Sequence, residues 1–221
     1  VGTLMLSLAN VSAAHGATYY KVENYYSQKD SVGFSKWAGL DAKKLDLEGP
    51  VEHTRFSALL KGTDAKVQVA GSAENRRRAG LDMTFSAPKS VSLQALVFGD
   101  TRLIHAHREA VSEALAYAER NFAAYRVGGR NDRSVVKPGR FLVAQFEHDS
   151  SRLKDPQLHT HNVVLNRMQS ANGKIRALHG DLFYKNSVLL GMIYQNSLLE
   201  LLNSQGFPKK TWLCFLKEKS N

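Results

Sequence analysis

Residues 155–165 read Asp-Pro-Gln-Leu-His-Thr-His-Asn-Val-Val-Leu, a segment with two histidines separated by a single residue. It starts in a polar connection, 149–158, and continues into a predicted strand from His159 to about Met168. Side chains at positions i and i+2 of a strand point to the same face of a sheet. His159 and His161 therefore project together from the beginning of this strand.

The preceding segment, 140–148, also predicts a strand, and His148 closes it. If the two strands pair antiparallel, the end of one and the start of the next lie at the same end of the sheet. Three imidazoles then converge, which suits a divalent metal with positions left open for substrate oxygens. A satisfied or exposed ring is the usual state of an isolated histidine, so the prediction depends on all three.

A second pair, His105 and His107, has the same spacing but lies within a predicted helix, 100–124. Residues i and i+2 of a helix point about 200° apart. This pair cannot share a metal ion, so it serves as a control for the effect of spacing alone.

The segment 81–85 predicts another strand, because apolar and polar residues alternate along it. Its apolar face carries Leu81, Met83 and Phe85, and its polar face carries Asp82 and Thr84. Asp82 is a candidate to orient a histidine or to accept a proton from a nucleophile. An ordinary surface aspartate is the plainer alternative.

The remaining elements complete an α+β plan. It has a mostly antiparallel central β-sheet with helices packed on it, as a two-layer sandwich. Asn172-Gly173 predicts a hairpin turn. Residues 27–70 are mixed, and no element is assigned to them. The other expected elements are an edge strand at 1–10, a helix within 13–26 followed by a loop, a helix opening at Ser86 or Lys89, and a long helix over 181–204.

The composition bounds the partners. The 221 residues include 30 Lys and Arg against 20 Asp and Glu, which gives a formal net charge of +10. A surface this basic attracts polyanions, and nucleic acid is the commonest. A single cysteine excludes an internal disulfide framework. No apolar run approaches the ~20 residues that span a bilayer. We therefore expect a cytoplasmic protein without membrane insertion.

Four of the eight tyrosines lie in two adjacent pairs, Tyr19-Tyr20 and Tyr25-Tyr26. A tyrosine attacks phosphorus when a neighbouring group takes its proton and a metal polarises the phosphate. Aromatic packing or stacking is the alternative for such a cluster. Neighbours on a helix point about 100° apart, so at most one member of each pair faces a metal.

Two ordered blocks, Leu81-Asp-Met-Thr-Phe-Ser-Ala-Pro-Lys-Ser-Val-Ser92 and 155–165, together with the tyrosine pairs, resemble the MobF-type conjugative relaxases. These belong to the HUH endonucleases. The resemblance implies a relaxase domain over 1–207 and leaves 208–221 as a divergent or truncated tail. No phosphate-binding G-x-x-x-x-G-K-[ST] motif is present, so no NTPase activity is predicted.

The resemblance implies a metal-dependent DNA endonuclease and strand transferase that nicks a plasmid transfer origin. Tyr19 would attack the scissile phosphate and form a 5′-phosphotyrosine link, and Tyr25 or Tyr26 would perform a later strand transfer. Asp82 matches the acidic residue near the nucleophile. One divalent ion, Mg²⁺, Mn²⁺ or Zn²⁺, would be held by His148, His159 and His161.

The implied partners are single-stranded and hairpin DNA at a transfer origin, relaxosome accessory proteins and the coupling protein of a type IV secretion system. Relatives of this kind are exported to the recipient cell covalently bound to DNA. Basic side chains near the two blocks are candidate phosphate contacts. They are Arg76, Arg77, Arg78 and Lys89, followed by Arg126, Arg130, Arg133, Lys137 and Arg140.

Three other functions would each explain part of the sequence. A rolling-circle replication initiator generally places its tyrosine after the histidine pair, where Tyr184 and Tyr194 lie without the expected motif. A truncated relaxase would bind origin DNA without cutting it. A zinc hydrolase of small substrates would explain the histidines but neither the tyrosines nor the basic charge.

Overall fold

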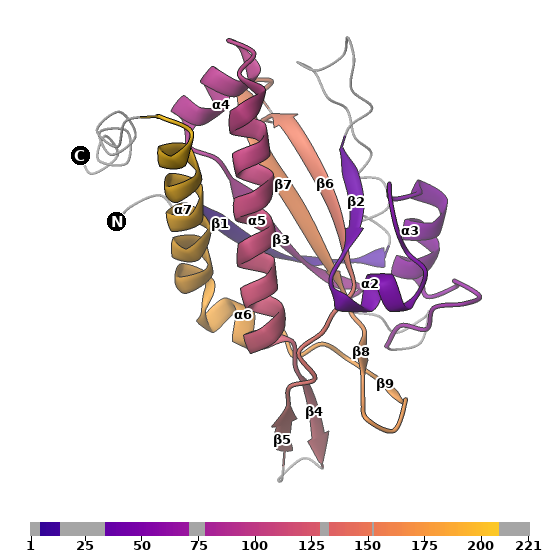
Figure 1. The fold of residues 1–221 in the computed structure, drawn as a ribbon. Coiled ribbons are helices and arrows are strands. Elements are labelled where there is room, and N and C mark those ends of the chain that lie inside the picture. Colours follow the sequence, from indigo (N-terminus) through magenta and orange to yellow (C-terminus); the bar gives the residue numbers. More distant parts are fainter. Residues whose placement is uncertain (1–4, 14–33, 71–77, 129–132, 152, 208–221) are drawn as a thin grey trace.

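The computed structural model describes residues 5–13, 34–70, 78–128, 133–151 and 153–207. Its centre is a five-stranded antiparallel sheet in the order β1-β3-β7-β6-β2. The predicted N-terminal strand is confirmed at one edge of this sheet (Figure 1). The strands are β1 (Leu6–Val11), β2 (Ser35–Ala38), β3 (Gly80–Ser86), β6 (Val143–Ser150) and β7 (Pro156–Leu165).

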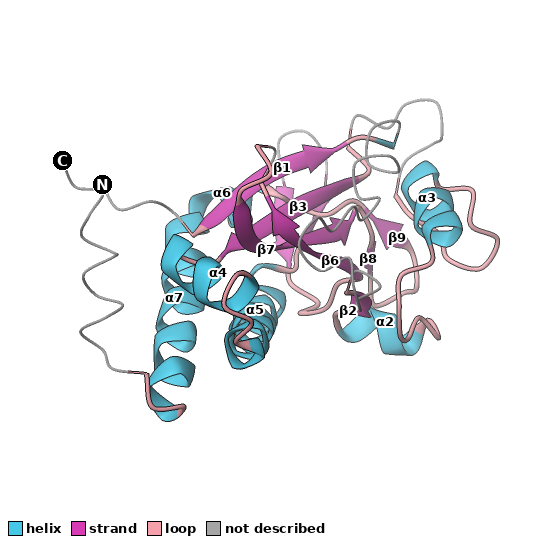
Figure 2. Cartoon of the chain, turned by 90° about the horizontal axis from the view of Figure 1, so that it is seen from above, coloured by secondary structure: helices cyan, strands magenta, loops and turns pink. Residues whose placement is uncertain are grey.

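Three helices, α4 (Lys89–Leu96), α5 (Thr101–Phe122) and α7 (Ser187–Ser204), cover one face of the sheet (Figure 2). The smaller α3 (His53–Lys61) packs on part of the opposite face, against Val163 and Leu165. The predicted α+β class with helices packed on an antiparallel sheet is therefore confirmed.

The alternation predicted for β3 is also confirmed. Leu81, Met83 and Phe85 are completely buried in the core beneath the helices. Asp82 and Thr84 consequently lie on the other face of the sheet. Gly80 lets this strand approach β7 closely, because a Cβ there would lie 2.7 Å from the Val164 carbonyl oxygen.

The connection between β6 and β7 is shorter than predicted. Ser150 ends β6 and Pro156 begins β7, so only 151–155 form the turn. Two hydrogen bonds tie the early part of β7 to the segment around α4. The Leu158 N–H donates to Ser92 Oγ at 3.0 Å, and the Gln157 side chain of β7 donates from Nε2 to the Ala87 carbonyl at 2.9 Å. His159 and His161 thus lie inside the strand rather than at its start.

Several elements were not predicted from the sequence. They are β2 and the helices α2 (Leu40–Lys44) and α3 within 34–70, and the hairpin of β4 (Tyr125–Gly128) and β5 (Arg133–Val136). The predicted turn at Asn172-Gly173 is confirmed between β8 (Met168–Gln169) and β9 (Ile175–Arg176).

The predicted long helix is divided at Asn186 into α6 (Asp181–Lys185) and α7. The Asn186 side chain donates to the Leu182 carbonyl at 2.7 Å, which takes up a carbonyl of the shorter helix at its end. The predicted helix and loop within 13–26 fall almost wholly outside the described residues, as does the tail 208–221.

Candidate metal centre

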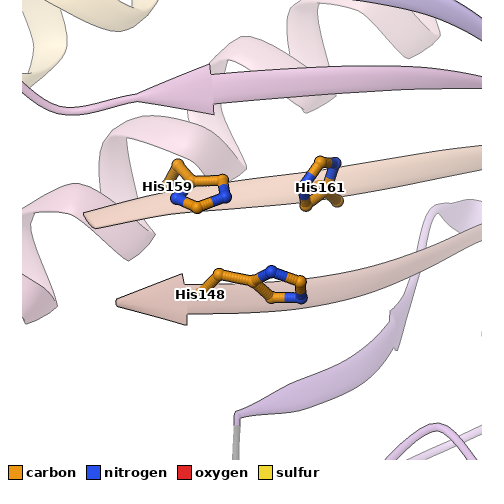
Figure 3. A group of neighbouring side chains, drawn as sticks. All are labelled: His148, His159 and His161. Carbon is orange, nitrogen blue, oxygen red and sulfur yellow. The ribbon is translucent and has the colours of Figure 1, made fainter. Parts of the chain in front are cut away.

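The three histidines lie together on the face of the sheet opposite α4, α5 and α7 (Figure 3). In the pairing of β6 with β7, His148 is directly opposite His159, and His161 is opposite Phe146. One ligand nitrogen from each ring lies within 4.8 Å of the other two. The convergence predicted from strand geometry is therefore observed.

Hydrogen bonds fix the orientation of two of the rings. His161 Nδ1 lies 2.7 Å from Asp82 Oδ2 and 2.9 Å from Thr84 Oγ1, and both partners come from β3. His159 Nδ1 donates to the Gln157 carbonyl at 2.8 Å. With Nδ1 occupied in each ring, the lone pair of Nε2 is available to a metal ion.

His148 supplies the third nitrogen. Its Nε2 is buried and has no hydrogen-bond partner among the described residues. Buried polar atoms are rarely left in this condition, and a metal ion is one partner that resolves it. The arrangement of three imidazole nitrogens therefore fits a divalent ion such as Zn²⁺ or Mn²⁺.

Burial also keeps the rings of His148 and His159 neutral. Burial lowers the pKa of His148 to about 4, with further lowering from His161 and His159. The pKa of His159 is also lowered, mainly by burial. Because only a neutral imidazole donates a lone pair to a metal, both rings are in the donor form at neutral pH.

The control pair behaves as predicted. On α5, His105 is exposed and His107 is completely buried, so the two side chains point to different sides of the helix. His107 contacts Tyr194 and Thr160, and neither contact was found from the sequence.

The candidate nucleophiles Tyr19, Tyr20, Tyr25 and Tyr26 lie outside the described residues. None of the four described tyrosines has a hydrogen bond or ring contact with His148, His159 or His161. Tyr117, Tyr125 and Tyr194 belong to the core beneath the helices or pack against it, and Tyr184 is exposed on α6. Burial also raises the pKa of Tyr194 far above its usual range.

Of the candidate phosphate contacts, Arg76 and Arg77 lie outside the described residues. The Arg78 guanidinium donates to the Leu178 carbonyl. Lys89 Nζ donates to the Pro156 carbonyl at 2.9 Å and lies 3.8 Å from an Asp155 carboxylate oxygen. Lys89 is thus near the histidine end of β7, whereas Arg78 precedes β3 at the other end of the sheet.

An antiparallel sheet with a His-x-His pair and a third histidine on one face, and helices on the other, is the arrangement expected of the HUH class. The family model described as TrwC relaxase matches residues 13–212. The chain belongs to the TrwC relaxase family.

Individual relatives agree with this assignment. The multifunctional conjugation protein TraI of Escherichia coli K12 is 38% identical over 216 residues, which cover 92% of this chain but 12% of TraI. The metal-bound structure of the conjugative relaxase TrwC in complex with oriT DNA is 37% identical, with a TM-score of 0.79 over 91% of this chain and 70% of that one.

A copper-bound complex of TrwC with oriT DNA gives a TM-score of 0.78 at 37% identity, covering 91% of this chain and 71% of that one. TrwC complexed with a 27-mer DNA comprising the recognition hairpin and the cleavage site gives a TM-score of 0.76 at 36% identity. This match covers 91% of this chain and 69% of that one. Within the part of the chain that the structure describes, no helix is long and apolar enough to cross a membrane.

Proposed function

We propose that this chain is the strand-nicking domain of a conjugative relaxase. It would cut one DNA strand at a plasmid transfer origin, with site and strand specificity, through a covalent 5′-phosphotyrosine intermediate. The observation that carries the proposal is the convergence of three imidazoles, one with a buried Nε2 that has no partner among the described residues, in a member of the TrwC relaxase family.

His148, His159 and His161 are the proposed metal ligands. A divalent ion bound there supplies Lewis-acid polarisation of the scissile phosphate. Three nitrogen donors suit Mn²⁺ and Zn²⁺, whereas Mg²⁺ normally prefers oxygen. Asp82 is the proposed orienting residue, because its carboxylate lies 2.7 Å from the Nδ1 of His161.

Tyr19 is the proposed nucleophile. Its phenolic oxygen forms the new bond to phosphorus while the bond from phosphorus to the 3′ oxygen breaks. The phenolic proton passes to a base, and the departing 3′ oxygen takes up a proton. Because one phosphate ester replaces another, the reverse reaction can rejoin the strand. The positions of the described tyrosines support a nucleophile from the N-terminal pairs.

The second pair is proposed to perform the later strand transfer. Tyr26 is seven residues from Tyr19, so on a continuous helix the two would share a face after about two turns. Tyr25 would reach the same site only if that helix were broken. Substituting each of them separately distinguishes the two.

Single-stranded and hairpin DNA at a transfer origin is the proposed substrate, as the DNA complexes of TrwC suggest. The proposed phosphate contacts are Arg76, Arg77, Arg78 and Lys89. Together, their charge interactions with the phosphates would make DNA binding sensitive to salt concentration. Relaxosome accessory proteins, a type IV secretion coupling protein and export with the DNA complete the proposal.

The test is formation of a covalent protein–DNA band on a denaturing gel. The protein is incubated with Mg²⁺ or Mn²⁺ and single-stranded oligonucleotides, including the 27-mer with the recognition hairpin and cleavage site. The variants are Tyr19→Phe and His161→Ala, with Tyr184→Phe as the matched control because Tyr184 is an exposed tyrosine on α6. We expect a band that EDTA, Tyr19→Phe and His161→Ala each abolish and Tyr184→Phe leaves unchanged.

Other outcomes would change the proposal in defined ways. A band that survives Tyr19→Phe but disappears with Tyr25→Phe or Tyr26→Phe would move the nucleophile and keep the chemistry. Binding without a covalent band, on an origin that a longer relative cleaves, would instead identify a DNA-binding protein that does not cut.

A further inference from the structure

A row of buried polar groups lies directly behind the proposed metal ligands, on the helix-facing side of β7. Thr160, between His159 and His161 in sequence, points to this side and is 3% exposed. Its hydroxyl lies 2.9 Å from His107 Nε2 on α5. The other ring nitrogen of His107 lies 2.7 Å from the Tyr194 hydroxyl on α7.

Both contacts of His107 are compatible with a neutral ring. Burial lowers the pKa of His107 to about 3, with smaller contributions from His159 and Arg108. A neutral imidazole donates through one nitrogen and accepts through the other, so both contacts can be hydrogen bonds simultaneously. One side chain therefore ties α5 and α7 to the strand at the residue between two ligands.

Asn162 continues the row on the other side of His161. Its Nδ2 donates to the Met83 carbonyl of β3 at 2.8 Å, and its Oδ1 accepts from Gln145 Nε2 of β6 at 2.7 Å. Asn162 thereby links β7, which carries His161, to β3, which carries Asp82, and to β6, which carries His148. The amide pair is completely or almost completely buried, and it fixes how the three strands lie beside one another.

Apolar side chains would fill this part of the core without the desolvation of polar groups. A buried network whose polar groups are hydrogen-bonded, as both ring nitrogens of His107 are, instead restricts the structure to one geometry. We propose that this row, above all Tyr194–His107–Thr160, positions His159 and His161 for metal binding. The inference rests on the proposed metal-dependent function, and its residues are positioning residues that do not touch the metal.

The test is Mn²⁺ affinity measured by calorimetric titration of the full chain. Thr160→Val keeps the shape of the side chain and removes its hydroxyl, whereas Thr160→Ser keeps the hydroxyl. Tyr194→Phe removes the hydroxyl that contacts the other ring nitrogen of His107. We expect Thr160→Val and Tyr194→Phe each to weaken Mn²⁺ binding roughly tenfold, the lower end for residues that support metal ligands. Thr160→Ser should retain the original affinity.

Two controls separate positioning from stability alone. Tyr117→Phe removes a hydroxyl on α5 that makes no hydrogen bond to a described residue. Leu115→Ala creates a cavity on the same helix, eight residues (about two turns) beyond His107. We expect Leu115→Ala to lower the melting temperature without changing Mn²⁺ affinity. The electron paramagnetic resonance spectrum of bound Mn²⁺ should change in Thr160→Val and stay unchanged in both controls.

Mn²⁺ affinity that is unchanged in Thr160→Val and Tyr194→Phe would overturn this inference while leaving the metal site intact. A loss of Mn²⁺ affinity in Leu115→Ala as large as in those variants would also overturn it, because the effect would then follow stability. If the unaltered protein bound no Mn²⁺ or other divalent ion, the proposed metal site would fail first and this inference with it.

Discussion

The chain contains two His-x-His pairs, and they differ in almost every property except spacing. His159 and His161 lie on a strand and share one face of the sheet with His148. His105 and His107 lie on a helix, where one ring is exposed and the other is completely buried. Two histidines separated by one residue therefore become a candidate metal site only where the backbone period places both side chains on one face.

The two pairs are nevertheless connected. The buried member of the helical pair contacts the residue between the two histidines of the strand pair. The first pair is proposed to hold the metal, and one member of the second is proposed to hold the first in place. Four experiments test this division of roles.

Removing a proposed ligand should have the largest effect. We expect His161→Ala to weaken Mn²⁺ or Zn²⁺ binding by more than the roughly 10- to 100-fold associated with supporting residues. His105→Ala, at an exposed position, should leave the affinity unchanged. Calorimetric titration of both variants measures the difference. Equal affinities in the two variants would remove the distinction between the pairs.

Removing the buried histidine should mainly affect folding. His107→Ala leaves a cavity and two hydroxyls without their partner, so we expect a loss of about 3 kcal/mol in the free energy of unfolding. His105→Ala should stay within about 0.5 kcal/mol of the original value. Urea denaturation followed by circular dichroism checks both values. A similar stability for the two variants would contradict the role of His107 in the core.

The stability of the protein should also depend on pH through His107. The pKa of this ring is about 3 in the folded protein and about 6.5 in the unfolded chain, so proton uptake favours unfolding. Its contribution to stability is complete above about pH 6.5 and is lost progressively as the pH falls toward 3. Between pH 7 and pH 5 this loss corresponds to about 2 kcal/mol.

The comparison with His107→Gln isolates this contribution. The pKa values of His148 and His159 are lowered in the same direction, so the unaltered protein has a steeper pH dependence than His107 alone produces. Denaturation at pH 7 and pH 5 should show a smaller decrease for His107→Gln than for the unaltered protein. Parallel decreases would mean that this ring does not titrate as its burial requires.

The smallest expected effect follows from Asp82→Asn. The amide keeps the size of the side chain but no longer offers a carboxylate to the Nδ1 of His161. We expect metal affinity to fall about tenfold, which is typical for a residue that orients a ligand. Metal titration measures this change, and Asp41→Asn, far from the histidines in a buried pair with Arg167, is the control. No change in Asp82→Asn would assign Asp82 a role other than orienting the ring.

Much of this division could be predicted from the sequence, because it depends on local periods. The alternation in β3 placed Asp82 and Thr84 opposite the apolar side chains, and the same rule placed His159 and His161 on one face. The helix predicted over 100–124 is α5, Thr101–Phe122, and the Asp100 side chain caps its start by accepting the N–H of Arg102. The spacing of apolar residues and the helix caps depend only on residues close together in the sequence, so both can be recognised without the structure.

The rest depends on contacts that no local pattern encodes. Tyr194 is 87 positions from His107, and Thr160 is 53 positions from it. The strand β2 has four residues and forms only because β6 offers it an edge. The hairpin of β4 and β5 likewise consists of two short strands that pair with each other. Such elements become visible only once the tertiary structure brings their partners together.

The alternation along β7 also determines where the chain can change in length. Within β7 one added or deleted residue would turn the following side chains to the other face, exchanging imidazoles for core residues. The turn over 151–155 has no such parity, and Leu153 there is 86% exposed. We therefore expect insertions to be tolerated in this turn and excluded from the strand beside it, so a reporter peptide placed after Leu153 should leave the histidines aligned.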